Sequence, residues 1–127
     1  AMLDVVPQVE ISHRAPAAFF SALKPRTVIP PHNGATNCRL TVHLPLIVPP
    51  DCAIRVGNHT RTWTPGQLLM FDDTIEHTAW NHSDQLRVVL IFDVWHPLLT
   101  ATERQLVKES LEGIMAYYGK DAPLGEL

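Results

Sequence analysis

Residues 39–71 read RLTVHLPLIVPPDCAIRVGNHTRTWTPGQLLMF and alternate β-forming runs with turn signals. Apolar, β-branched and aromatic residues concentrate in the runs 39–48, 53–56, 60–63 and 67–71. Gly57-Asn58 is a hairpin-type turn, and Pro65-Gly66 fits a type II turn in which glycine accepts a positive φ. The segment therefore predicts several short strands joined by tight turns, which is typical of an antiparallel sandwich or barrel.

The pattern changes on the C-terminal side of this segment. Residues 86–95 (LRVVLIFDVW) form a nearly continuous apolar run, as expected for a strand covered on both faces. Thr100 and Glu103 fit a capping box, and the apolar positions that follow recur at helical spacing, so a helix is predicted over about 101–118, ending at Gly119. On the N-terminal side, residues 16–23 (PAAFFSAL) fit either one helical turn or an edge strand.

Composition favours one small domain. The 127 residues include 10 Lys and Arg against 13 Asp and Glu, which gives a formal net charge of −3. A chain of this length buries about two-thirds of its unfolded surface, so it needs no disulfide or metal for stability. Basic residues are scattered, so we expect neither nucleic acid nor an anionic membrane as a partner. The longest apolar run, residues 88–92, is too short to span a bilayer.

The predicted organisation is a single domain over residues 1–127. Its β-barrel core covers about residues 19–99, and the C-terminal helix covers about 101–118. Eleven prolines (Pro 11) argue against a helical bundle. Two cysteines, Cys38 and Cys52, make no disulfide framework, so we expect a soluble protein in a reducing compartment, the cytoplasm. The opening Ala1-Met2 and the short length suggest a fragment of a longer protein.

Histidine is the first indication of function, because the chain contains seven (His 7). His32 lies in PPHNG before a predicted strand, and His77 follows FDDTIE between two predicted strands, so a small barrel can bring both rings to one mouth. Imidazole suits iron, zinc, copper and nickel, and two histidines with open positions are the minimum for a metal that also binds substrate. The pattern alone fits two unrelated histidines equally well.

Three ordered segments, residues 29–49, 62–77 and 87–97, resemble the aspartyl/asparaginyl β-hydroxylases. These are Fe(II)- and 2-oxoglutarate-dependent dioxygenases built on a double-stranded β-helix, the jelly-roll or cupin-like fold. The resemblance covers about residues 19–99 and implies a mainly β chain of that fold, followed by a C-terminal α-helix.

The resemblance also implies that His32 and His77 are the Fe(II) ligands. Most 2-oxoglutarate oxygenases carry a third, carboxylate ligand two residues after the first histidine, where this chain has Gly34. The family lacks that carboxylate, so Gly34 agrees with the assignment. Two neutral imidazoles leave positions for the chelating oxo-acid and for O2 as co-substrates.

By the same resemblance, Arg87 is the catalytic-site arginine that binds the far carboxylate of 2-oxoglutarate, helped by Ser21. His43 corresponds to a co-substrate residue nearer the metal. The chain departs from some members at Thr41, where they carry an arginine. Arg39 lies on the same strand face as Thr41 by alternation and is a candidate replacement.

Each of these residues also has a purely structural interpretation. His43 fits a buried core histidine, and Arg87 fits an ordinary charge at the start of a strand. Asp72 and Asp73 fit turn residues that bind the backbone better than they fit metal ligands. Glu76 is expected to point away from its neighbour His77.

The remaining aromatic and histidine residues are expected in the core, at its rim or on the surface. Three tryptophans fit the core or rim: Trp63, Trp80 and Trp95. Four histidines fit the surface: His13, His59, His82 and His96. His82 and Asn81 are also candidates for the rim of the site.

The leading functional hypothesis is a dioxygenase that hydroxylates an aliphatic C–H bond, the β-carbon of Asp or Asn in a peptide or protein. An alternative within the family is a lipid acyl-chain hydroxylase, so the partner is a peptide, protein or small-molecule substrate. A vacant iron position that accepts chloride would instead give a halogenase. The alternative from another class is a cupin-like barrel that binds a metal or small ligand without oxidative turnover.

Overall fold

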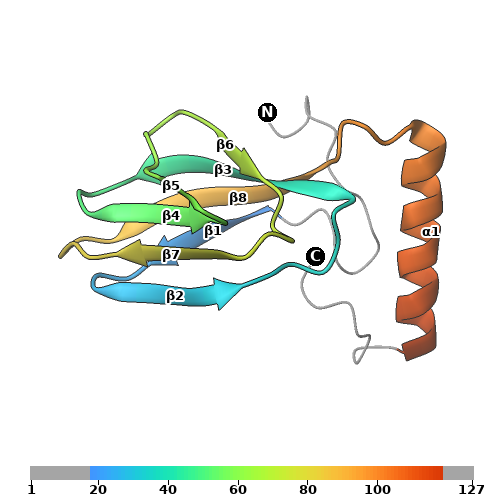
Figure 1. Ribbon diagram of the computed structural model, residues 1–127, viewed down its shortest axis with the longest axis horizontal. Helices are drawn as coiled ribbons and strands as arrows, with labels where there is room; N and C mark the ends of the chain where they lie inside the picture. The colour runs from blue at the N-terminus through green and yellow to red at the C-terminus, as the bar shows by residue number, and fades with distance from the viewer. Residues whose placement is uncertain (1–17, 119–127) are drawn as a thin grey trace.

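The structure, a computed structural model, describes residues 18–118 and shows two four-stranded sheets and one helix within that range (Figure 1). The elements in chain order are β1 (Ala18–Leu23), β2 (Thr27–His32), β3 (Arg39–Ile47), β4 (Cys52–Val56), β5 (His59–Arg61), β6 (Leu69–Phe71), β7 (His77–Asn81), β8 (Arg87–Trp95) and α1 (Ala101–Tyr118).

Two antiparallel sheets face each other. The β8 sheet has the order β1-β8-β3-β6, and the β7 sheet has the order β2-β7-β4-β5. Strands that follow one another in the chain mostly alternate between the two sheets, because only the β4–β5 hairpin stays within one of them. This arrangement confirms the predicted mainly β, cupin-like jelly roll with a C-terminal helix.

Most local predictions agree with the structure. Residues 16–23 fit either a helical turn or a strand, and their described part is the edge strand β1. Gly66 has a φ of 81°, as the type II turn requires. The capping box forms, with Thr100 N donating to Glu103 Oε1 at 3.0 Å and Glu103 N donating to Thr100 Oγ1 at 3.1 Å. The predicted helix end at Gly119 lies outside the described residues.

The two site histidines differ from the sequence prediction in their local structure. His32 is the last residue of β2 rather than a residue before a strand, and His77 is the first residue of β7 rather than part of a connection. Pro30 and Pro31 make β2 hard to predict, because proline cannot donate to a ladder. They are tolerated here since β2 is an edge strand.

Two apolar clusters hold the fold together. Between the sheets lie Ile54, Trp63 and Val89, all buried. At one end of the sheets, Leu111 of α1 packs with Cys38 and Trp95, so the helix crosses the strand ends rather than covering a sheet face (Figure 1). Both cysteines are unpaired thiols.

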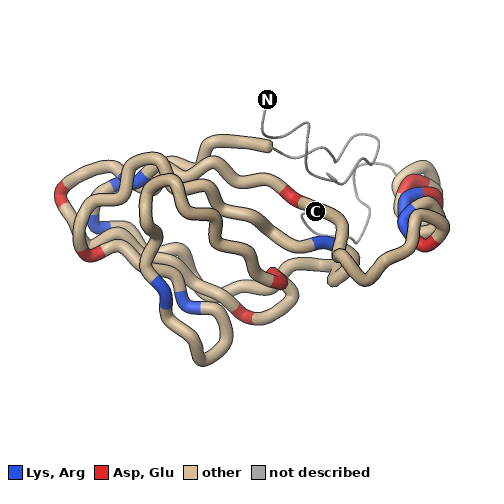
Figure 2. Tube along the Cα trace, turned by 90° about the horizontal axis from the view of Figure 1, so that it is seen from above, with Lys and Arg blue, Asp and Glu red and all other residues tan. Residues whose placement is uncertain are grey.

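Charged residues of both signs are spread along the described chain, and neither sign gathers on one side of the part shown (Figure 2). No helix within residues 18–118 is long and apolar enough to cross a membrane.

Candidate active site

His32 and His77 lie opposite each other on neighbouring strands of the β7 sheet. They are paired in the β2–β7 ladder just after a register shift between Ile29 and His32, and their ring centroids are 4.2 Å apart. The bulge changes the direction of the end of β2, so that the His32 and His77 rings both line the same cavity.

Backbone carbonyls determine which ring nitrogen of each neutral histidine carries the hydrogen. His32 Nδ1 lies 2.9 Å from the carbonyl oxygen of Pro30, and His77 Nδ1 lies 2.8 Å from that of Ile75. A carbonyl only accepts, so each Nδ1 must carry the hydrogen. In the neutral ring this tautomer leaves Nε2 with a free lone pair, which is the form in which imidazole binds a metal.

The pair opens into a cavity of about 170 Å³ between the sheets. Its lining includes every residue that the sequence singled out for metal or co-substrate binding: Ser21, His32, His43, His77 and Arg87. No group of three or more His, Cys, Asp or Glu side chains able to hold a metal occurs within residues 18–118. The donor set here is thus two imidazoles, which suits a metal that must keep several positions open for other ligands.

Gly34 lies two residues after His32, and the Asp73 carboxylate occupies the space where a side chain at position 34 would begin. A Cβ at Gly34 would overlap the carboxylate atoms of Asp73, and Gly34 N donates to Asp73 O at 2.6 Å. Asp73 is anchored from its other side, because Arg39 Nη2 donates to its Oδ2 at 3.0 Å. A carboxylate therefore lines the same cavity as the histidine pair, although it comes from the β6–β7 connection.

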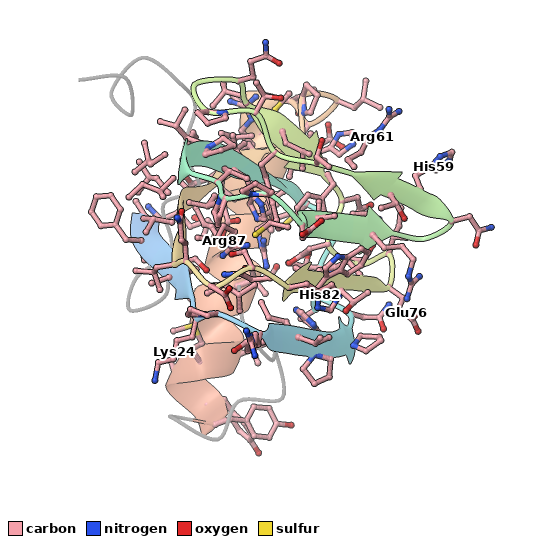
Figure 3. The ribbon with its side chains drawn as sticks, turned by 90° about the vertical axis from the view of Figure 1, so that its left-hand side faces the viewer. Lys24, His59, Arg61, Glu76, His82 and Arg87 are labelled. Carbon is pink, nitrogen blue, oxygen red and sulfur yellow. The ribbon has the colours of Figure 1, made fainter. Side chains whose placement is uncertain are left out.

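Arg87 forms the opposite end of the cavity and is 1% exposed (Figure 3). Its Nη2 donates to Ser21 Oγ at 2.8 Å, and its guanidinium carbon lies 4.6 Å from the centroid of the Trp63 ring. We call Arg87 and Ser21 the clamp. Within residues 18–118, no carboxylate pairs with Arg87, and its buried Nε has no hydrogen-bond partner. Burial lowers the pKa of Arg87, but a guanidinium stays charged at neutral pH.

His43 lies between the clamp and the histidine pair. Its Nδ1 accepts a hydrogen bond from Trp63 Nε1 at 3.1 Å, so in the neutral ring the hydrogen is on Nε2. Burial, then Arg87 and His77, lower the pKa of His43 from 6.5 to about 3, which keeps it neutral. His43 is thus a buried, hydrogen-bonded histidine that also lines the cavity.

Arg39 confirms the face expected from alternation, because its side chain lies over Thr41. Nη1 donates to Thr41 Oγ1 at 3.1 Å and to Asp93 Oδ1 at 2.9 Å. Together with Asp73, this makes a buried cluster of one guanidinium and two carboxylates that lines the cavity. Burial raises the pKa of Asp93, although Arg39 opposes that shift.

The other sequence interpretations mostly agree with the structure. Asp72 is a turn residue, since its Oδ1 accepts from Thr74 N at 2.9 Å. Glu76 points away from the cavity and pairs with Arg55 (Figure 3). The suggestion that His82 and Asn81 rim the site is wrong: His82 is exposed, and Asn81 is buried without lining the cavity.

Most of the remaining tryptophans and histidines take the places that were expected of them. Trp63 and Trp95 are buried, Trp80 is half-buried and His59 is exposed. His96, also expected at the surface, is half-buried. His13 lies outside the described residues.

Comparison with known proteins gives a family. A family model described as aspartyl/asparaginyl beta-hydroxylase matches residues 1–97. The aspartyl/asparaginyl beta-hydroxylase of Mus musculus is 47% identical over 87 residues, which are 68% of this chain and 12% of that protein. The ornithine lipid ester-linked acyl 2-hydroxylase of Rhizobium tropici is 48% identical over 84 residues, 64% of this chain and 30% of that protein.

Solved structures agree on the fold. The Cupin_2 domain of an XRE family transcriptional regulator from Enterobacter cloacae superposes with a TM-score of 0.52 at 14% identity, covering 62% of this chain and 80% of that one. The chain spans less than a third of either curated relative, and the match to the family model extends across all the strands and every residue of the cavity. The chain belongs to the aspartyl/asparaginyl β-hydroxylase family.

Proposed function

We propose that this chain is an Fe(II)- and 2-oxoglutarate-dependent dioxygenase domain that hydroxylates the β-carbon of an Asp or Asn residue in a peptide or protein. In the reaction, 2-oxoglutarate loses CO2 and becomes succinate. One atom of O2 enters succinate and the other becomes the new hydroxyl group. Two electrons from the oxo-acid and two from the C–H bond reduce O2.

The observation that carries the proposal is the buried charge of Arg87 at the far end of the histidine cavity, which no carboxylate of residues 18–118 pairs with. A buried guanidinium without an anion is costly, so its place calls for an anionic ligand. Its planar fork suits a carboxylate, and Ser21 Oγ fixes its orientation. A cavity of about 170 Å³ is below the range of drug-sized sites and suits a compact dicarboxylate.

The other end of the cavity suits the metal. His32 and His77 would hold iron through their Nε2 atoms, with Pro30 O and Ile75 O keeping the rings in the required tautomer. When bound, iron would supply the chelation of the oxo-acid and the activation of O2. His43 would offer its Nε2 hydrogen to the carboxylate nearer the metal, since Trp63 occupies its Nδ1.

Binding of 2-oxoglutarate is tested by anaerobic titration of the Fe(II)-loaded chain, with the visible metal-to-ligand charge-transfer absorption as the readout. We expect the absorption to appear in the wild type. Arg87→Met should weaken 2-oxoglutarate binding by at least about tenfold, because a charged hydrogen-bond partner is lost, while Fe(II) affinity is unchanged. Arg61→Met, at an exposed arginine of β5, is the matched control. Iron binding without any such absorption would favour the cupin-like barrel that lacks oxidative turnover.

The substrate class needs a separate test. The Rhizobium relative, named as an acyl 2-hydroxylase, supports an acyl-chain substrate as the second candidate. The chain should be incubated with Fe(II), 2-oxoglutarate and O2, with either Asp- and Asn-containing peptides or ornithine lipid, and the products examined by mass spectrometry. Gain of one oxygen atom by the peptide supports the proposal, whereas oxygen gained only by the lipid overturns its substrate.

A further inference from the structure

Asn81, the last residue of β7, is fully buried (0% exposed) behind the cavity. Its Nδ2 donates to the carbonyl oxygens of Leu23 at 3.0 Å and Gln85 at 2.8 Å. Its Oδ1 accepts from Ser83 N at 3.0 Å and from Cys52 Sγ at 3.2 Å. Both amide hydrogens and the amide oxygen are therefore engaged, which fixes the side chain in one orientation.

The two carbonyls that Asn81 binds lie on β1, which carries Ser21, and in the turn that leads into β8, which carries Arg87. Leu23 lies two residues after Ser21 on β1, and Gln85 lies two residues before Arg87, where β8 begins. Leu23 and Arg87 are also direct partners in the β1–β8 ladder. One amide group from the β7 sheet thus binds the backbone of both segments at the end of the β1–β8 ladder.

The ladder between β1 and β8 runs to Leu23 and Arg87, and within residues 18–118 it is the one ladder of the edge strand β1. The turn that precedes β8 follows β7 directly, so the Asn81 amide adds a link from the other sheet at the point where this ladder ends. Loss of the amide would leave two carbonyls without their donor. The ends of β1 and β8 would then be free to shift relative to each other.

We propose that Asn81 is a positioning residue for the clamp. Its amide holds the end of β1 in place relative to the start of β8, so that Arg87 Nη2 can donate to Ser21 Oγ. The guanidinium is thereby held at a fixed position in the cavity, where it can bind a carboxylate. The identity of that carboxylate, 2-oxoglutarate, rests on the proposed function, whereas the clamp geometry does not depend on it.

The binding test compares two acids in the Fe(II)-loaded chain without O2. 2-Oxovalerate has the same chain length and chelating end as 2-oxoglutarate but lacks the distal carboxylate. In Asn81→Ala we expect the dissociation constant of 2-oxoglutarate to rise about tenfold, with that of 2-oxovalerate and the affinity for Fe(II) unchanged. An equal rise for both acids, or no rise, would overturn the proposal, since a merely structural role cannot tell the two acids apart.

A second readout needs neither metal nor acid. Nitrogen NMR of the Arg87 guanidinium should show resolved Nη signals in the wild type, because Ser21 and Trp63 restrain its rotation. We expect these signals to average in Asn81→Ala, and an unchanged spectrum would contradict the positioning role. If the wild type binds neither acid but the Arg87 signals still average in Asn81→Ala, the proposed function is refuted and the positioning role stands.

Two further variants complete the design. Thr78→Val is the matched control, because it removes a buried side-chain hydrogen bond from the same strand, to Ile29 O, without touching β1 or β8. It should leave the ratio of the two dissociation constants and the Arg87 spectrum unchanged. If Asn81→Ala does not fold, Asn81→Asp carries the test, since it keeps the shape and the bonds from Ser83 but loses both donors.

Discussion

Gly34 shows how a position without a side chain leaves room for a carboxylate in the wall of the cavity. The position next to the histidine pair is filled by the Asp73 carboxylate, which Arg39 holds in place. The absence of a side chain at position 34 is therefore a steric requirement of this fold as well as a matter of ligand chemistry.

Gly34→Ala should destabilise the chain by about 1–3 kcal/mol, because the added methyl group overlaps Asp73 and forces it off Arg39. Urea unfolding of a double-mutant cycle checks this, since the cost should largely disappear in an Asp73→Ala background. Gly113→Ala is the control. Gly113 lies inside α1, where an added methyl group would meet no atom within 4 Å, so alanine there should stabilise by about 0.5–1 kcal/mol. Additive effects of Gly34→Ala and Asp73→Ala would contradict the steric account.

His43 makes stability depend on pH. Its pKa falls from 6.5 to about 3 on folding. Between these two pH values His43 is protonated in the unfolded chain and neutral in the folded chain. The contribution to the free energy of unfolding should fall by about 1.4 kcal/mol per pH unit below 6.5, or about 2 kcal/mol by pH 5. Denaturant unfolding of the metal-free wild type and His43→Asn at pH 7 and 5 measures it. The stability difference between the two proteins should shrink at pH 5, and a constant difference would count against a neutral, buried His43.

Among the elements, α1 is the one whose start is marked most clearly in the sequence. Thr100 and Glu103 form a reciprocal capping box, and the helix then packs Leu111 onto the ends of the sheets. Thr100→Ala should lower stability by about 1 kcal/mol through loss of the cap. Circular dichroism and urea unfolding would test this, with Thr102→Ala, one position inside the helix, as control. An equal loss in both variants would mean that the cap itself contributes nothing.

The same comparison of elements explains what the sequence could predict. Residues 39–71 and 86–95 carry strong β patterns, so their strands, turns and general fold are readable. β7 (HTAWN) is short and half polar, so its pattern does not predict a strand. His32 and His77 are candidates from their sequence pattern, whereas Ser21, His43 and Arg87 are found through the family resemblance. Asn81 is misplaced by sequence reasoning because one of its main partners, Leu23 O, lies 58 residues away and is a backbone atom with no sequence signal.

At the level of the whole molecule, the cavity joins the two sheets. The β7 sheet contributes His32 and His77, and the β8 sheet contributes Ser21, His43 and Arg87. A ligand that touches both ends therefore restrains the sheets against each other and stabilises the folded chain.

Mn(II) and 2-oxoglutarate, each at about 100 times its dissociation constant, should together raise the melting temperature by about 10 °C or more, since each bound ligand adds about 2.7 kcal/mol. Differential scanning calorimetry provides the measurement, and chelation of the metal should reverse most of the shift. His32→Ala should lose the response to Mn(II). A full shift from 2-oxoglutarate in that variant would show that the acid binds without the histidine pair.

The split of the cavity between two sheets also separates two kinds of selectivity. In the proposed function, the ion would be held by residues of the β2–β7 ladder, and the organic acid would be recognised by side chains of the facing sheet. Mutational drift in the second layer can change which oxo-acid is accepted without rebuilding the first. A library of variants at positions 21, 43 and 87 is thus a small set in which to search for new co-substrates while His32 and His77 are kept unchanged.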